Sequence, residues 1–225
     1  MNNKIIFGLY LIALLLQSCT KPEKCARYFE IPATIKPAWR EYHVGDTILI
    51  ESTFSKEVLA FNSENTELHT FDMSGIKWEP ITLVFRIDTL GQAGYSSMRE
   101  DFVFYPSPLF DYAPFTFSTN SNVLVGEYAG KSDSFTLVIK LSCKTAGTFF
   151  LRQNSRVIAG ATYAQDFPGR CGRNGFDVWV KMNDGVNNNV DLLKESPDPY
   201  WNNLIFNQAK SQFYQVGGCC FRVLP

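Results

Sequence analysis

The stretch FTLVIKL, residues 135–141, and the stretch ITLVFRID, residues 81–88, share one simple pattern. Every second residue in each is large and apolar: Phe135, Leu137, Ile139 and Leu141 in the first, and Ile81, Leu83, Phe85 and Ile87 in the second. Successive side chains of a β-strand point to opposite faces, so a period of two places these apolar residues on one face. The sequence therefore predicts two strands, each half-buried against a core.

Shorter stretches of the same kind recur along the chain. They are DTILIES (46–52), DFVFY (101–105), VLVGEY (123–128), GTFFLRQ (147–153), FDVWVK (176–181) and CCFRVL (219–224). Turn-forming residues such as Gly45, Pro106 and Gly217 separate them from their neighbours. Many short strands between turns are typical of a β-sandwich or a β-barrel, so we predict a mainly β fold.

Two stretches resemble parts of immunoglobulin-like domains. HVGDTILIES (43–52) resembles the turn into their second strand, and TAGTFFL (145–151) resembles their sixth strand. Phe149 stands where these domains carry the tyrosine of the tyrosine corner, and Leu151 stands where they carry a disulfide cysteine. The resemblance implies an immunoglobulin-like β-sandwich, which we expect to span residues 26–225, and it implies no function.

One short helix is expected late in the chain. Asp198 is a suitable N-cap, Pro199 suits the first helical position, and apolar residues follow at helical spacing as far as about Gln212. We therefore expect residues 170–214 to form a loop and helix elaboration of the sandwich, placed before the last strand.

The composition is that of a globular, nearly neutral protein. Of 225 residues, 45% are apolar and 15% aromatic, which is enough to bury a core. The 21 basic and 22 acidic side chains leave a formal net charge of -1. No overall field favours a polyanion, so nucleic acid is not an expected partner.

The first residues have the pattern of an export signal. Lys4 precedes an uncharged apolar run from Ile5 to Leu16, and its twelve residues are fewer than the roughly 20 that a membrane-spanning helix needs. The following Leu16-Gln17-Ser18-Cys19 resembles the lipobox of bacterial lipoproteins. The resemblance implies that residues 1–18 are a signal peptide and that Cys19 carries the lipid.

Likeness to that family implies a protein anchored to a membrane of the cell envelope. Acyl chains on Cys19 would hold the protein on a bilayer, with residues 19–25 as a lipidated tether. Thr20, and not aspartate, follows Cys19, which favours the outer membrane. The periplasmic and the external face both stay open.

Five further cysteines would meet an oxidising compartment after export, which favours disulfides. They are Cys25, Cys143, Cys171, Cys219 and Cys220. The first candidate joins Cys171 to Cys219 or Cys220, because that bridge would close a loop of about 50 residues and stabilise the fold by roughly 3 to 4 kcal/mol. A Cys25 to Cys143 bridge is the second candidate. A Cys219 to Cys220 bridge and buried free thiols stay open as alternatives.

The sequence contains no recognisable catalytic signature. Two histidines, His43 and His69, cannot make a three-histidine zinc site, and no G-x-S-x-G, H-E-x-x-H, P-loop or G-x-G-x-x-G motif occurs. We therefore assign no catalytic residue, metal site or cofactor. The carboxylate pair of a glycoside hydrolase cannot be recognised by its spacing, so such an enzyme stays open.

Two sets of residues are candidates for ligand contacts. Oxygen ligands, which calcium prefers, gather in KMNDGVNNNVD (181–191), although Asn-Asp-Gly is also a common turn; the candidates there are Asn183, Asp184 and Asp191. Aromatic rings in or beside expected loops could stack on a sugar or receive a peptide; these are Trp39, Tyr112, Phe115 and Trp201.

The observations favour a lipid-anchored, non-catalytic binding or interaction module with a protein or glycan ligand. An anchored hydrolase that acts on glycans or envelope polymers is the alternative, and a structural subunit of an envelope assembly is a third reading. None of the motifs found names the ligand.

Overall fold

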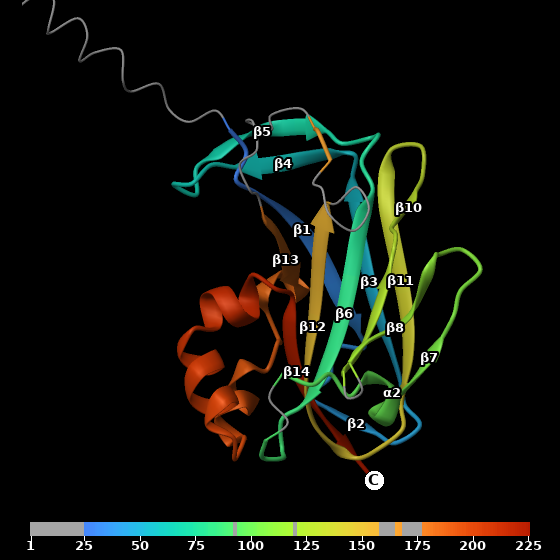
Figure 1. Cartoon of the computed structure of the whole chain (residues 1–225), viewed down its shortest axis with the longest axis vertical. Helices are drawn as coiled ribbons and strands as arrows, with labels where there is room; N and C mark the ends of the chain where they lie inside the picture. Colours follow the sequence, from blue (N-terminus) through green and yellow to red (C-terminus); the bar gives the residue numbers. More distant parts are fainter. Residues whose placement is uncertain (1–24, 92–93, 119–120, 158–164, 168–176) are drawn as a thin grey trace, which may run out of the picture.

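The structure is a computed structural model that describes residues 25–91, 94–118, 121–157, 165–167 and 177–225. These residues form two β-sheets and a short helical layer (Figure 1). The first sheet has the order β10-β11-β3-β1-β4-β5, with β13 also paired to β1 and β7 also paired to β11. Its strands are β1 (Tyr28–Lys36), β3 (Thr47–Ser55), β4 (Glu57–Phe61), β5 (Glu67–Asp72), β7 (Phe102–Tyr105), β10 (Ala129–Gly130), β11 (Ser134–Cys143) and β13 (Asp177–Met182).

The second sheet has the order β2-β14-β12-β6-β9-β8. Its strands are β2 (Glu41–His43), β6 (Trp78–Arg86), β8 (Tyr112–Ser118), β9 (Ser121–Gly126), β12 (Gly147–Val157) and β14 (Gly218–Leu224). Buried residues of both sheets, among them Ile50, Leu137, Val84 and Leu151, belong to one core cluster. The molecule is therefore a β-sandwich, and the predicted fold class is confirmed.

The pattern that predicts the strand at residues 135–141 is confirmed in full. Phe135, Leu137, Ile139 and Leu141 of β11 are all buried in the core between the sheets. The polar Lys140 between them is exposed, as alternation requires. Central strand β3 pairs with β11 over nine residues, which fixes the register that places these side chains inward.

The pattern at residues 81–88 predicts the strand correctly but not the surroundings of its two faces. Thr82 and Val84 of β6 point into the sandwich and are fully buried. Phe85 and Ile87, on the opposite face, are buried in a second cluster beneath the helical layer. β6 is thus covered on both sides at this end, because the chain adds a third layer that alternation alone does not predict.

The helical layer consists of short segments and not of one regular helix. They are η1 (Asn183–Gly185), η2 (Val190–Glu195), η3 (Tyr200–Ile205) and η4 (Lys210–Tyr214); η3 and η4 are π-helical. Asp198 acts as the predicted cap, since its carboxylate accepts a hydrogen bond of 2.9 Å from the Tyr200 N–H. Figure 1 shows this layer beside β13 and β14.

The strand β13 is part of the sandwich and not of the elaboration. It runs parallel to β1, from Tyr28 opposite Asp177 to Ala33 opposite Met182. The region expected to elaborate the fold, residues 170–214, therefore contains a strand of the first sheet, and within the described residues the helical layer begins only at Asn183.

Candidate binding pocket between two strand edges

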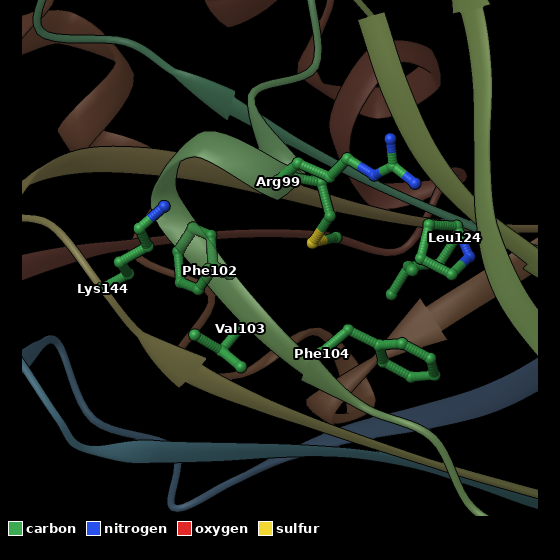
Figure 2. A pocket seen from close by; sticks show the side chains of 8 residues that line it. Arg99, Phe102, Val103, Phe104, Leu124 and Lys144 are labelled. Carbon is green, nitrogen blue, oxygen red and sulfur yellow. The ribbon is translucent and has the colours of Figure 1, made fainter.

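A pocket of about 300 Å³ opens at the side of the sandwich where β7 of the first sheet lies near β8 and β9 of the second. Its lining residues come from these strands, from the short helix α2 (Met98–Asp101) and from the turn after β11: Met98, Arg99, Phe102, Val103, Phe104, Pro114, Leu124 and Lys144. Figure 2 shows Phe102, Val103 and Phe104 along β7, with Leu124 across the pocket from Phe104. Most of this lining is apolar.

The floor of the pocket is continuous with the core. Met98, Phe102 and Leu124 are buried and belong to the core cluster between the sheets. The Phe104 ring is half-buried and lies edge-on to the Tyr112 ring, with 6.0 Å between the centroids. A side chain that entered the pocket would therefore contact rigid apolar groups, which is typical of a preformed binding site.

The edge of β7 beside the pocket is open to a further strand. Lys144 N donates to Asp101 O at 2.8 Å. Along an antiparallel pair of strands, hydrogen-bonded and non-hydrogen-bonded residues alternate, so the backbone groups of Val103 and Tyr105 bond to β11. The backbone groups of Phe102 and Phe104 therefore point away from β11. The Phe102 N–H is used within α2, where it donates to Met98 O. The backbone N–H and C=O of Phe104 thus face the side on which β7 has no strand partner among the described residues.

The edge of β8 is blocked by a proline. Glu127 N donates to Asp111 O at 2.8 Å, so by the same alternation Tyr112, Pro114 and Thr116 turn their backbone groups away from β9. Pro114 has no N–H to offer at this edge, and proline on an edge strand discourages the addition of another strand. Of the two edges beside the pocket, β7 is the one that can accept a strand.

Two cations stand at the rim of this apolar pocket. Figure 2 shows Lys144 beside Phe102, while the Arg99 guanidinium reaches toward Leu124. Both side chains are exposed, and neither makes an ion pair with a carboxylate of the described residues. No carboxylate lines the pocket. The site therefore presents apolar surface with unneutralised positive charge.

A partly buried ion pair fixes α2, and with it Arg99 and Phe102. The Asp101 carboxylate, whose side chain is only 5% exposed, accepts hydrogen bonds from Arg86 and from the Thr145 hydroxyl. Burial acts to raise the pKa of Asp101, but the hydrogen bonds from Arg86, Ser97 and Thr145 and the charge of Arg86 outweigh it, so that pKa is lowered. Arg86 also lies over the Phe149 ring, with its Cζ 5.0 Å from the centroid.

The four aromatic residues predicted to contact a ligand divide into two pairs. Tyr112 is 6% exposed and Trp201 only 2%, so both are core residues and their assignment as ligand-stacking rings is wrong. The hydroxyls of Tyr112 and Thr82 share a hydrogen bond inside the sandwich, and the Trp201 ring packs on Phe85 under the helical layer. Trp39 and Phe115 are about half exposed, and neither lines the pocket.

In the oxygen-rich stretch 181–191, predicted as a calcium candidate, the candidate side chains bond within the protein and shape the turn after β13. Asn183 accepts a hydrogen bond of 2.9 Å from Ile35 N and donates to the Asn188 side chain, while Asp191 is held by two hydrogen bonds from Arg40. Asp184 adopts a positive φ of 53°. Among the described residues no three His, Cys, Asp or Glu side chains are grouped so that they could hold a metal ion. Asparagine and aspartate tolerate positive φ, which accounts for this composition.

The proposed disulfides of the C-terminal cysteines are wrong. Cys143, Cys219 and Cys220 are free, buried thiols, so neither the Cys171 bridge to Cys219 or Cys220, nor a Cys25 to Cys143 bridge, nor a Cys219 to Cys220 bridge forms. Burial raises the pKa of Cys143 and of Cys219 to about 12, which keeps both protonated and unreactive. Cys25 is disulfide-bonded, but no disulfide joins two described cysteines.

The histidines and the two remaining cysteines form no common site in the described part of the chain. His43 lies at the end of β2 and His69 on β5, which are at opposite ends of the molecule, so the two cannot serve one catalytic centre (Figure 1). Cys19 and Cys171 lie outside the described residues. In the ranges the structure describes, no helix has the length and apolar character that a membrane span requires.

The sequence did not reveal this pocket. Its one signal was the strand DFVFY, where exposed Val103 and Tyr105 alternate with the inward Phe102 and Phe104, so that apolar side chains occupy both faces. Arg99 and Lys144 are 45 positions apart in the chain, and only the pairing of β7 with β11 brings them to one rim.

No family model and no curated protein matches the chain. Similar solved structures include the human F-spondin reeler domain (10% identity, 65% of this chain and 92% of that one, TM-score 0.31). A cohesin module from a family 33 glycoside hydrolase of Clostridium perfringens is similar at 13% identity (68% and 99%, TM-score 0.31). A type II cohesin domain from the cellulosome of Acetivibrio cellulolyticus shows 8% identity (67% and 91%, TM-score 0.29). At such TM-scores the likeness carries no functional inference.

Proposed function

We propose that the protein is a non-catalytic binding module whose pocket beside β7 takes an extended, acidic segment of a partner protein. The observation that carries the proposal is the open edge of β7 next to an apolar pocket with two unpaired cations. An added strand would bond the Phe104 backbone, and because side chains alternate, one apolar side chain of the segment would enter the pocket. Acidic residues beside it would approach Arg99 and Lys144.

This geometry favours binding over the alternative of an anchored hydrolase. Hydrolysis of a glycosidic bond usually takes two carboxyl groups roughly 5 to 10 Å apart across a cleft. The pocket beside β7 has no carboxylate in its lining, and the pocket beside β13 described below has one, Glu30. Each of these two pockets offers contacts, and neither offers a pair of acid and base groups.

A pair of synthetic peptides tests the acidic character of the partner. Each carries one leucine in an extended segment, flanked by aspartates in one peptide and by lysines in the other. We expect the aspartate peptide to bind more tightly, with an affinity that falls as salt is added, because the cations at the rim are exposed and screened. Titration calorimetry at two salt concentrations measures both effects.

Substitutions at the rim make the same test from the protein side. Arg99→Gln and Lys144→Gln should each weaken binding of the aspartate peptide by about 1.4- to fivefold, because an exposed ion pair contributes about 0.2 to 1 kcal/mol. Lys131→Gln, at an exposed lysine outside the pocket, is the matched control and should change nothing. Two outcomes would show that the pocket does not select acidic segments: equal affinity for the two peptides, or wild-type affinity for the aspartate peptide in a variant that carries both Arg99→Gln and Lys144→Gln.

We further propose that the module is displayed on the cell envelope, in the outer membrane, by lipid on Cys19. The support is the likeness of Leu16-Gln17-Ser18-Cys19 to a lipobox after a short apolar run. Cys19→Ser should move the protein from the membrane fraction to the soluble fraction, because the acyl chains can then no longer be attached. Cys143→Ser is the control at a buried thiol and should stay in the membrane fraction; unchanged membrane recovery of Cys19→Ser would refute lipid anchoring.

A further inference from the structure

A second pocket, of about 240 Å³, lies where β13 meets the helical layer, away from β7 (Figure 1). It is lined by both aromatic and charged side chains: Glu30, Trp179, Lys181, Lys210, Tyr214 and Gln215 are among its residues. Glu30 stands opposite Trp179 in the β1–β13 register, and η4 contributes Lys210 and Tyr214. Residues from two strands and a helical segment therefore meet at one place on the surface.

The Trp179 ring is held in a stack of three aromatic rings. Its centroid lies 3.5 Å from that of Tyr28, with an interplanar angle of 19°, and Tyr28 stacks in turn on Phe61 at 4.8 Å and 2°. Tyr28 covers one face of the indole, while Trp179 itself lines the pocket. The stack fixes the plane of the indole, so a ring that packs on it would meet a preorganised surface.

The charges around this ring do not cancel. Lys181 and Lys210 outnumber Glu30, and none of the three makes an ion pair within the described part of the chain. Elsewhere on the same sheet a lysine and a glutamate do pair, since Lys36 and Glu51 lie 2.5 Å apart. The pocket thus keeps one carboxylate to accept hydrogen bonds and two ammonium groups for an anion.

We propose that this pocket binds one sugar ring that carries a carboxylate, such as a hexuronate unit. The apolar C–H face of a sugar suits stacking on the Trp179 indole, sugar hydroxyls suit Glu30 and Gln215, and the carboxylate suits Lys181 and Lys210. The pocket is smaller than the roughly 300 to 1,000 Å³ of sites for drug-sized ligands, which fits a single ring. This site is separate from the pocket beside β7, and neither proposal depends on the other.

The test compares glucuronate with glucose, which differs from it by lacking the carboxylate. Each sugar is titrated into the full chain in detergent, and binding is followed by saturation-transfer NMR and by tryptophan fluorescence. We expect glucuronate to bind at least about fivefold more tightly than glucose, because two charged hydrogen bonds are added. Trp179→Ala should weaken both sugars by about tenfold, because the stacking surface is lost.

Lys210→Gln is the decisive variant, since Lys210 is exposed on the helical layer and its replacement leaves the ring stack in place. It should reduce the preference for glucuronate and leave glucose binding unchanged. Tyr200→Ala removes an exposed ring outside the pocket and should alter neither. Equal affinity for the two sugars, no saturable binding of either, or a preference for glucuronate that Lys210→Gln leaves undiminished would overturn the proposal.

Discussion

At the scale of single residues, the ion pair of Asp101 and Arg86 is a charged contact that lies next to the proposed peptide pocket. We expect Asp101→Asn to lower the free energy of unfolding by about 3 kcal/mol, because the Arg86 guanidinium, whose side chain is 24% exposed, then keeps only the more distant carboxylate of Asp88, 3.7 Å from its Nη1. Chemical denaturation at neutral pH measures this loss. Asp133→Asn, at an exposed aspartate, is the control, and an equal effect of the two would show that the buried pair adds nothing.

The same pair gives the protein a defined response to acid. The folded pKa of Asp101 is lowered, so its stabilisation is complete above the unfolded value of about 3.9 and is lost as the pH falls through the folded value. The gap in stability between the wild type and Asp101→Asn should therefore close as the pH drops below about 4.

The described cysteines differ in their bonding state. Cys143, Cys219 and Cys220 are free, and Cys25 is disulfide-bonded, so Cys19 and Cys171 are the partners left for Cys25. If Cys19 carries lipid, Cys171 remains, and the parallel pairing of β1 and β13, with Tyr28 opposite Asp177, places the first residues of both strands at one end of the sheet. We expect mass spectrometry of the unreduced protein to link the Cys25 and Cys171 peptides, with three thiols that resist alkylation until unfolding. A Cys171 thiol that reacts in the native protein would exclude this link.

At the scale of elements, the alternation of apolar and polar residues predicts the strands well, but it predicts poorly what packs on each face of a strand. Residues 135–141 of β11 have one covered face, so their period of two identifies the core directly. Residues 81–88 include Thr82, which is fully buried on the face expected to meet water, because Tyr112 and Gln153 satisfy its hydroxyl. A polar residue with buried partners cannot be distinguished from a surface residue in the sequence.

The binding surfaces also belong to this scale, which is why the sequence did not predict them. Beside the pocket at β7, Pro114 closes one strand edge while Phe104 keeps the other open. Both follow from which residues of β7 and β8 bond to their neighbouring strands. A place in or beside an expected loop does not by itself predict a ring that meets a ligand, as Trp201 shows. It lies in a helical segment, but its ring fills the second core.

At the scale of the whole molecule, two hydrophobic clusters share one sheet. The first lies between the sheets and the second under the helical layer, and β6, β12 and β14 contribute neighbouring residues to both, as Val84 and Phe85 do. If the layer on either face of this sheet came away, it would expose apolar residues of the same strands whose other face is still packed. The sandwich and the helical layer are therefore expected to unfold together.

This expectation can be tested with a pair of substitutions in η3. Trp201→Ala should remove about 3 to 5 kcal/mol of stability, because it leaves a cavity beside Phe85 and Phe150, whereas Leu204→Ala, at a side chain 45% exposed, should cost less than about 1 kcal/mol. In denaturant, the loss of β-sheet circular dichroism and of amide-exchange protection within η3 should share one midpoint, and Trp201→Ala should shift both by the same amount. If η3 lost protection at a lower denaturant concentration while the sheet signal kept the wild-type midpoint, the helical layer would be an independent unit and the shared sheet would not couple the two cores.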